Sequence, residues 1–287
     1  MLIVNMEKYS VLMSIYYKEN PDYFIQSIES MLNQSVKPDE IVIVKDGPLT
    51  KELDEVIDNY VTKEFNLFTI VPLKKNVGLG LALNEGLKMC RNELVARMDT
   101  DDISLQNRCE LQLNEFKKDQ QLSIVGSWTN EFYDDPTNIV TVRNVPENHE
   151  EILKFSRRRS PFNHPTVMYK KSEVLRCGGY HDVERKEDID LFIRMLNQGC
   201  KAMNIPQSLL LFRSNEDNYK RRKSWVNCKS YISVVYKFWK EGYSSTTDLI
   251  FVIVGQLVMF VSPIWFLKIL SDSVLRKKVT PDKRVLP

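Results

Sequence analysis

Hydrophobic positions follow two periods along the first hundred residues, and the two periods alternate. Short runs of strand-forming apolar residues are separated by segments with apolar residues three or four positions apart, which is helical spacing. The predicted strands are Tyr9–Tyr16, Glu40–Val44, Phe68–Pro72 and Leu94–Met98, and the predicted helices between them are Tyr23–Asn33, Leu53–Tyr60 and Gly80–Cys90. Four strands interleaved with three helices favour a parallel sheet covered on both faces.

After residue 102 the alternation becomes looser, and the character of the chain changes again near residue 220. The predicted elements of the middle part are a helix over Leu105–Phe116, strands near Ile124–Phe132 and Val167–Tyr169, and a helix from about Glu187 to Gly199. Between Arg213 and Lys240, eight basic residues are interleaved with aromatic ones, and Leu249–Leu267 then carries no charge. We therefore predict one domain over residues 1–217 and a separate C-terminal part over 218–287.

The composition excludes several classes of protein. With 43% hydrophobic and 27% charged residues, the 287-residue chain is typical of a globular protein. A net charge of +2 gives no overall basic field, so we expect no nucleic acid as a partner. Five cysteines without a CxxC pair and three scattered histidines predict neither a zinc site nor a disulfide framework. The N-terminal residues lack the features of a secretory signal, so we expect the first of these two parts to lie inside the cell.

Three carboxylates within four residues are the strongest chemical signal. Asp99, Asp101 and Asp102 directly follow the predicted strand Leu94–Met98. Like charges this close are unfavourable unless a cation neutralises them, and carboxylate oxygens suit Mg²⁺ or Mn²⁺. The cluster therefore predicts a divalent metal site. The alternative is a solvated acidic turn before the next helix, with Asp102 or Ser104 as its N-cap.

Asp46 is predicted to lie at the same edge of the sheet as this cluster. It follows the second predicted strand, and the ligands of such sheets bind outside the carboxyl ends of the strands. One pocket there would hold a nucleotide base near Asp46 and its phosphates, through a metal, near Asp101. The alternative for Asp46 is a plain turn residue before Gly47 and Pro48.

A second pair of carboxylates, Glu187 and Asp188, opens the predicted helix that ends near Gly199. One interpretation is a general base. The other is a capping role, since the dipole of a helix stabilises carboxylates near its N-terminus. Asp190 is predicted to lie on a different face and to be structural. His164, in a loop before an apolar strand, is predicted to make a structural hydrogen bond or to lie at the edge of the pocket.

Six motifs in a fixed order resemble those of a known family. They are SIYYKENPDYFIQSIESMLNQS, EIVIVKDGP, NVGLGLALNEGL, ARMDTDD, PFNHPTVMYKKS and KEDIDLFIRM, within about residues 9 to 215. The chain resembles glycosyltransferase family 2, a family of inverting nucleotide-sugar transferases. It looks most like the bacterial branch that builds capsule, exopolysaccharide and O-antigen units. The resemblance implies an α/β fold of the GT-A type, with a Rossmann-like, mostly parallel mixed sheet flanked by helices.

The resemblance also implies roles at the nucleotide-binding edge. Tyr16 would stack on the base, and Asp46 would bind it. Asp99 and Asp101 match the DxD motif, in which Asp99 contacts the ribose or the metal. Asp101 would coordinate the Mn²⁺ or Mg²⁺ ion that bridges the diphosphate.

For the chemistry, Asp188 matches the catalytic base of the family, with Glu187 beside it. The base would take a proton from an acceptor hydroxyl as its oxygen attacks the anomeric carbon, and the configuration inverts. Arg213 and the basic stretch Lys220–Lys223 would follow on a loop that closes over the diphosphate. Arg213 is therefore a candidate substrate-binding residue. His164 is a second candidate, through its predicted place at the edge of the pocket.

The implied function is transfer of a single hexose from a nucleotide sugar, expected to be a UDP-sugar, to a lipid-linked oligosaccharide. The Gln-x-x-Arg-Trp motif of processive relatives is absent, so we expect one sugar per encounter. A turn that reads Lys45-Asp46-Gly47-Pro48 departs from the acid-Asp-Gly-Ser of the family, which leaves base selection open. One alternative is a sugar-1-phosphate nucleotidyltransferase, although Tyr16–Pro21 lacks the glycines of its phosphate loop. The other is an inactive membrane scaffold of a polysaccharide assembly complex.

The C-terminal part is predicted to associate with a membrane. Its uncharged run Leu249–Leu267 is at the lower limit for a spanning helix, and Pro263 would end a helix there. Basic residues on both sides of the run disfavour a single span. We expect a re-entrant or interfacial anchor, with Trp225 and Trp239 at headgroup depth, on the cytoplasmic face of the bacterial plasma membrane. The alternatives are a helix pair packed on the catalytic domain or forming an oligomer interface, and a true single span.

Overall fold

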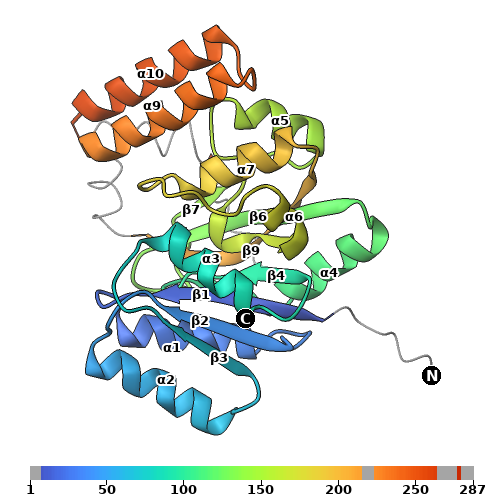
Figure 1. Ribbon diagram of the computed structural model, residues 1–287, viewed down its shortest axis with the longest axis vertical. Helices are drawn as coiled ribbons and strands as arrows, with labels where there is room; N and C mark the ends of the chain where they lie inside the picture. The colour runs from blue at the N-terminus through green and yellow to red at the C-terminus, as the bar shows by residue number, and fades with distance from the viewer. Residues whose placement is uncertain (1–7, 215–222, 264–276, 279–287) are drawn as a thin grey trace.

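The computed structural model describes residues 8–214, 223–263 and 277–278 (Figure 1). Its strands are β1 (Tyr9–Ile15), β2 (Glu40–Lys45), β3 (Phe68–Pro72), β4 (Leu94–Arg97), β5 (Ile103–Ser104), β6 (Leu122–Phe132), β7 (Thr141–Arg143), β8 (Met168–Lys170), β9 (Lys201–Arg213) and β10 (Lys277–Lys278). Its helices are α1 (Pro21–Leu32), α2 (Lys51–Lys63), α3 (Leu79–Met89), α4 (Arg108–Lys118), α5 (His149–Ser156), α6 (Lys171–Arg176), α7 (Glu187–Asn197), α9 (Trp225–Lys240) and α10 (Thr246–Val261), with a 3₁₀ turn over His164–Thr166.

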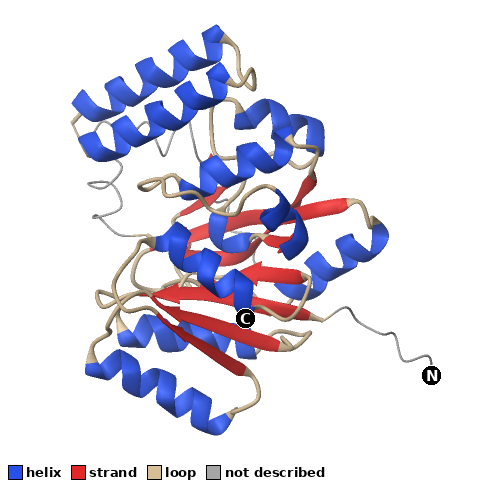
Figure 2. Ribbon diagram, viewed as in Figure 1, coloured by secondary structure: helices blue, strands red, loops and turns tan. Residues whose placement is uncertain are grey.

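These strands form one mixed sheet, in the order β10-β7-β6-β8-β4-β1-β2-β3, and β9 pairs with β5 and β6. The four strands predicted first make its parallel part, because β1 pairs with β2 and β4, and β2 pairs with β3. Beyond β4, the pairs β4–β8, β8–β6 and β6–β7 are antiparallel, whereas β9 runs parallel to β6. Figure 2 shows helices on both sides of this sheet, which is the predicted α/β architecture.

Two hydrophobic clusters lie on opposite faces of the sheet. One contains residues of α1, α2 and α4, and the other contains residues of α3, α5, α6 and α7. Successive residues of β1 alternate between them, with Val11 in the first cluster and Leu12 in the second. Because both faces of β1 are covered, the strand is mostly apolar and does not alternate regularly between apolar and polar residues.

The elements predicted for the first 118 residues are present, with ends that differ by three residues at most. Local chemistry explains the differences. The Asn20 side chain accepts hydrogen bonds from the Asp22 and Tyr23 amides, and Pro21 occupies the first helical position, so α1 begins earlier than predicted. The Thr50 hydroxyl caps α2 in the same way.

The strand β9 was not predicted, although it is the longest strand that the structure describes, with 13 residues. It contains Pro206, which has no N–H to donate and argues against a strand in the sequence. The pairing with β6 is irregular at this point, since Ser127 is opposite Ile205 but Trp128 is opposite Ser208. The irregularity accommodates the proline within the strand.

The C-terminal helices α9 and α10 form a hairpin that packs on the catalytic domain. Val234 and Phe238 of α9 pack against Ile189 and Ile193 of α7. On another side α9 packs against α10, and the two helices lie together beside α5 and α7 in Figure 1. The described helices therefore pack on the catalytic domain, as one alternative expected, while association with a membrane stays a prediction. The predicted boundary at residues 217 and 218 lies outside the described residues.

The helix α10 ends at Val261, two residues before Pro263, as the proline predicts. Residues 264–267 of the uncharged run lie outside the described part. Among the described residues, no helix is long and apolar enough to cross a membrane. Trp239 is half-buried, and its indole nitrogen donates to the Thr246 hydroxyl at 3.2 Å, so it belongs to the hairpin junction.

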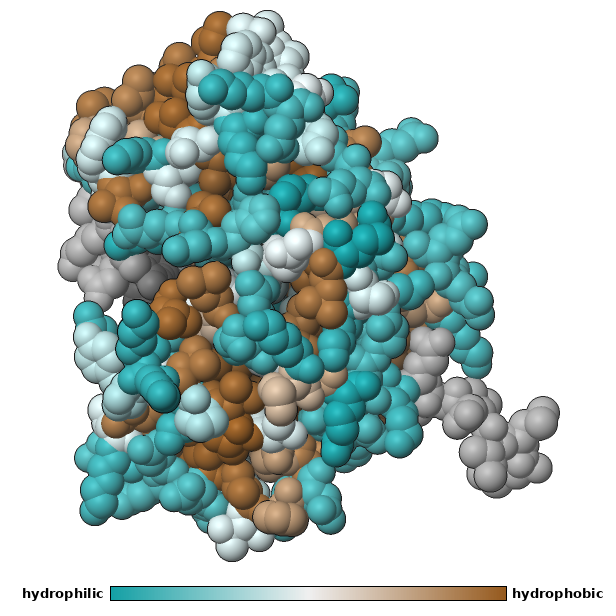
Figure 3. Space-filling model, viewed as in Figure 1, coloured by the Kyte–Doolittle hydropathy of each residue, from teal (hydrophilic) through white to brown (hydrophobic). Residues whose placement is uncertain are grey.

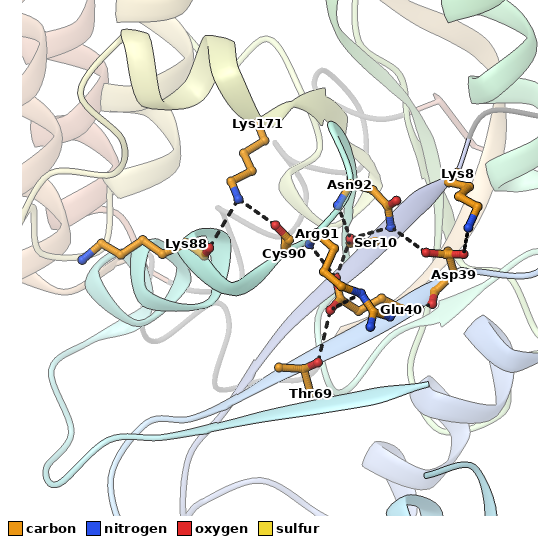
Figure 4. Close-up of polar contacts among 10 residues, drawn as sticks. All are labelled: Lys8, Ser10, Asp39, Glu40, Thr69, Lys88, Cys90, Arg91, Asn92 and Lys171. Atoms are coloured by element: carbon orange, nitrogen blue, oxygen red, sulfur yellow. Dashed lines mark hydrogen bonds and ion pairs between the residues drawn. The ribbon is translucent and has the colours of Figure 1, made fainter. Parts of the chain in front are cut away.

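A buried carboxylate fixes the end of β2 that lies away from the predicted site (Figure 4). Glu40 is 1% exposed and accepts hydrogen bonds from the Ser10 hydroxyl at 2.8 Å and the Thr69 hydroxyl at 3.1 Å. Arg91 adds its backbone amide at 2.8 Å and an ion pair at 3.2 Å. Glu40 is therefore a satisfied structural carboxylate, in contrast to those at the other end of the strands.

Candidate active site

Three of the predicted residues follow neighbouring strands at the carboxyl edge of the sheet. Tyr16 comes directly after β1, Asp46 after β2, and Asp99 two residues after β4. Since β1 pairs with both β2 and β4, the fold brings these positions to one edge, as the sequence predicts. Tyr16 is 39% exposed there, so its ring is accessible to a ligand.

The acidic cluster is compact. Asp99, Asp101 and Asp102 each have a carboxylate oxygen, and these three atoms lie within 4.8 Å of one another. Burial and the neighbouring Asp99 carboxylate raise the pKa of Asp101 to about 7, and burial raises the pKa of Asp102 well above its ordinary value. Asp102 Oδ2 is buried and has no hydrogen-bond partner among the described residues. Such a donor set fits a divalent cation, which would neutralise the charges that burial makes costly.

The capping interpretation of this cluster is wrong. The next helix, α4, begins only at Arg108, with Asn107 at its N-cap position. Asp102 instead accepts a hydrogen bond from the Arg213 backbone amide at 2.9 Å, and Ser104 lies in β5. The carboxylates are therefore held by the sheet and not by a helix terminus.

Arg97 is a buried cation that the sequence reasoning did not single out. Its guanidinium pairs with Asp99, and its Nε and Nη1 atoms have no hydrogen-bond partner within the described part of the chain. It lowers the pKa of Asp101 and of Glu187, against the stronger effect of burial, so it acts on both groups of carboxylates. The available signal was a charged residue in the strand LVAR, which is otherwise apolar.

Arg213 is not on a loop, contrary to the prediction. It is the last residue of β9 and is 5% exposed. Its Nε donates to the Asp101 carbonyl at 2.9 Å, and its guanidinium lies 3.8 Å from the centre of the Tyr23 ring. Arg213 is thus part of the wall behind the acidic cluster. In the stretch Lys220–Lys223, only Lys223 lies among the described residues.

Asp46 holds the loop that precedes α3. Its two carboxylate oxygens accept hydrogen bonds from the Val77 amide at 2.7 Å and the Gly78 amide at 3.1 Å. Gly78 has φ of 90°, a conformation that favours glycine, so the turn depends on this residue. Contact between Asp46 and a nucleotide base stays a prediction.

Glu187 and Asp188 form the first turn of α7, where Lys186 at the N-cap position makes no side-chain cap. Burial, with the Asp188 charge as the second cause, raises the pKa of Glu187 to about 7. A Cβ atom added to Gly80 of α3 would lie 2.9 Å from the Glu187 Cβ, so the two helices approach closely here. Glu187 also lines a groove of about 500 Å³ between the start of α3 and the loop before α7.

His164 is half-buried in the 3₁₀ turn before β8. Its Nε2 atom is 2.9 Å from the Tyr180 hydroxyl, and its ring packs edge-on against Phe192 with 5.7 Å between centroids. Burial and the nearby Arg97 charge lower its pKa well below the ordinary value, so the ring is neutral. The structural hydrogen bond that the sequence allowed is present.

The fold and the carboxylates along its edge define an α/β enzyme of the GT-A class. The sequence profile described as Glycosyl transferase family 2 matches residues 10–179. The chain belongs to this family and is a glycosyltransferase, as the six motifs predicted. This assignment replaces the nucleotidyltransferase alternative.

Two curated relatives extend over most of the chain. The UDP-Gal:alpha-D-GlcNAc-diphosphoundecaprenol beta-1,3-galactosyltransferase of Escherichia coli is 37% identical over 270 residues, which cover 94% of this chain and 97% of the relative. The amylovoran biosynthesis glycosyltransferase AmsE of Erwinia amylovora is 37% identical over 228 residues, which cover 79% of this chain and 84% of the relative. The first name describes transfer of galactose to GlcNAc-diphosphoundecaprenol, and the second a glycosyl transfer in amylovoran biosynthesis.

Solved structures share the fold at low sequence identity. The mannosyltransferase PcManGT from Pyrobaculum calidifontis, in complex with GDP-Man and Mn²⁺, has a TM-score of 0.65 at 14% identity, covering 92% of this chain and 73% of its own. TarS of S. aureus in complex with UDP-GlcNAc has a TM-score of 0.57 at 15% identity, covering 88% of this chain and 78% of its own. These likenesses confirm the GT-A-like fold.

Proposed function

We propose that this protein is an inverting, metal-dependent hexosyltransferase that moves one hexose from a UDP-sugar to a lipid-linked saccharide. One observation carries the proposal. The acidic cluster after β4 and the Glu187–Asp188 pair of α7 are separate sets of carboxylates, and the buried Arg97 acts electrostatically on both. Glycosyl transfer needs this separation, because binding a diphosphate and accepting a proton are different tasks.

The donor would bind along the edge of the sheet. Tyr16 would stack on the base, Asp46 would contact it, and Asp99 would contact the ribose. Arg213 would add positive charge beside the phosphates, and His164 would support the sugar pocket. UDP-galactose is the donor to test first, because the relative of Escherichia coli uses UDP-Gal according to its name.

Asp99 and Asp101 would hold Mn²⁺ or Mg²⁺. The unpartnered Oδ2 atom of Asp102 and the three converging oxygens support this assignment. When bound, the ion supplies positive charge that stabilises the departing nucleoside diphosphate. The raised pKa of Asp101 is consistent with a carboxylate that needs a cation to remain ionised.

Asp188 would act as the catalytic base. It accepts the proton of an acceptor hydroxyl while that oxygen forms a bond to the anomeric carbon and the bond to the diphosphate breaks on the opposite face. One displacement inverts the configuration. Glu187 lies beside the base and lines the groove, and there it would contact a sugar hydroxyl.

The acceptor would be a saccharide linked to a lipid diphosphate, as in the name of the relative from Escherichia coli. Such an acceptor places the reaction at the cytoplasmic face of the bacterial plasma membrane, and the C-terminal part would serve as the anchor. Capsule, exopolysaccharide or O-antigen units are the expected products.

Release of nucleoside diphosphate from a panel of UDP-, GDP- and dTDP-sugars tests the proposal. We expect turnover of one UDP-hexose that needs Mn²⁺ or Mg²⁺ and increases when GlcNAc-diphosphoundecaprenol is added. Asp188→Asn should bind the donor but not transfer, and Asp101→Ala should lose both. Retention of configuration in the product, or undiminished turnover after chelation, would contradict the mechanism.

A further inference from the structure

The outward side of α10 is an exposed apolar surface. Six residues recur there at helical spacing, with side chains between 42% and 73% exposed, and we name them the α10 stripe: Ile250, Phe251, Val254, Leu257, Val258 and Val261. In Figure 3 hydrophobic residues, drawn in brown, gather over this helix at the top of the molecule. Isolated exposed apolar residues are common in soluble proteins, but a continuous stripe along four turns is not.

The other side of α10 already packs against α9. Leu249 and Val252 are buried against Val235 of α9, and the Ser245–Asp248 capping box fixes the start of the helix. A helix that is hydrophobic all round belongs in a protein core or in lipid. With 16 residues, α10 is shorter than the ~20 that a spanning helix needs. It fits a helix that lies in the plane of a membrane surface.

The chemistry around the stripe matches the headgroup region of an anionic bilayer. At one end Trp225 packs against Phe260, with ring centroids 5.3 Å apart, and Trp225 is 53% exposed. At the other end the exposed Arg158 lies over the Phe251 ring and pairs with Asp248. The described residues 223–263 contain four lysines against two acidic residues. Aromatic and basic groups around an apolar helix are the pattern of interfacial anchors.

We infer that the α10 stripe is the membrane-docking surface of this enzyme and that its partner is the anionic leaflet of a phospholipid bilayer. The stripe enters the acyl boundary, while Trp225 and Arg158, at its two ends, contact the headgroups. This places α9 as the connection between membrane and catalytic domain, because its opposite side packs on α7. The inference deepens the proposed function, in which the acceptor is lipid-linked.

Vesicle flotation of the full chain, after removal of detergent, tests the inference. The probes are vesicles of phosphatidylcholine alone and of phosphatidylcholine mixed with phosphatidylglycerol. We expect the protein to float with the mixed vesicles, and less so with the neutral ones or at high salt. The double variant Val254→Asp with Val258→Asp should bind at least about tenfold more weakly. Two apolar side chains that would enter the bilayer are replaced by charged ones.

Phe65→Asp is the matched control. Phe65 is 78% exposed but lies after α2, away from the hairpin, so this variant should float like the unchanged protein. Equal flotation of the double variant, or no flotation of the unchanged protein, overturns the inference. If light scattering finds a dimer that the double variant abolishes while nothing floats, the stripe joins two copies of the chain instead.

Donor turnover in detergent, measured on the same preparations, separates this inference from the proposed function. The stripe residues are exposed and lie on the side of α10 away from α9, so the double variant should keep turnover and its unfolding midpoint. Flotation without turnover of any nucleotide sugar contradicts the proposed function alone. Turnover without flotation contradicts the docking surface alone.

Discussion

Lys237 of α9 donates a hydrogen bond to the fully buried Asp190 of α7, with Nζ and Oδ1 3.0 Å apart. The other oxygen of Asp190 accepts from Arg194 at 2.7 and 2.8 Å and lies 2.9 Å from Nδ1 of His181. Asp190 is therefore structural, as its helical face predicts. One carboxylate joins the C-terminal hairpin to the helix that carries the candidate catalytic pair.

Substitutions of Asp190 and of Lys237 should lower the free energy of unfolding by different amounts. Asp190→Ala leaves the buried Arg194 without its counterion, which costs about 3–5 kcal/mol in the free energy of unfolding. Lys237→Met should cost about 1 kcal/mol or less, since Asp190 keeps two other partners and the Lys237 side chain is 41% exposed. Urea unfolding measures both. Equal losses of stability in the two variants would mean that the hydrogen bond from Lys237 accounts for the stabilisation by Asp190.

The sequence was sufficient for the part of the fold that local patterns control. Apolar runs and helical spacing located β1 to β4 and the helices between them, because each is buried on a face that the pattern displays. The strand β9 was missed because Pro206 argues against a strand, and only its long-range pairing with β6 overrides that. Element ends were displaced wherever a side-chain cap, such as Asn20, decided them.

The part of the candidate site that was predicted consists of residues that are close together in the sequence. Asp99 and Asp101 are two positions apart in the chain and also close in space. Arg97 was missed because its importance lies in where it is buried, between carboxylates that are distant in sequence. Arg213 was assigned to a loop because nothing near it in sequence shows that β9 ends behind the acidic cluster.

Divalent metal should stabilise the protein through the acidic cluster. At a Mn²⁺ concentration about 100 times the dissociation constant, we expect the unfolding midpoint to rise by about 5–10 °C. Asp101→Asn should abolish most of this rise. Glu40→Gln is the control, since Glu40 is buried but already satisfied by hydrogen bonds, so it should lower the midpoint and keep the response to metal. A response that survives in Asp101→Asn would place the ion elsewhere.

Gly80 should be sensitive to the smallest substitution. In Gly80→Ala the new Cβ would meet Glu187 at 2.9 Å, so α3 or the carboxylate must move. We expect kcat to fall about tenfold to a hundredfold, because displacements near 1 Å have such effects on catalytic geometry. Gly255→Ala is the matched control, as its Cβ would meet no heavy atom within 4 Å. Equal kcat values for the two variants would show that Glu187 tolerates displacement.

Glu187 should also make stability depend on pH. Its pKa rises from 4.5 to about 7 in the folded protein, mainly through burial. Between these two values the folded state holds a proton that the unfolded state has lost, so raising the pH removes stability until the folded pKa is passed. Glu187→Gln cannot ionise and escapes this loss. Relative to the unchanged protein it should gain up to about 3 kcal/mol at pH 8 and nothing near pH 4.

Unfolding in urea from pH 4 to pH 8, with EDTA present, measures this difference. EDTA removes metal, which would otherwise add its own pH dependence through Asp101. Glu184→Gln is the control, because Glu184 is exposed on the loop before α7 and should follow the unchanged protein at every pH. The gain of Glu187→Gln should grow from about pH 4.5 to 7 and then stay constant. A gain that is the same at pH 4 and pH 8 would mean that packing, and not the charge of Glu187, destabilises the first turn of α7.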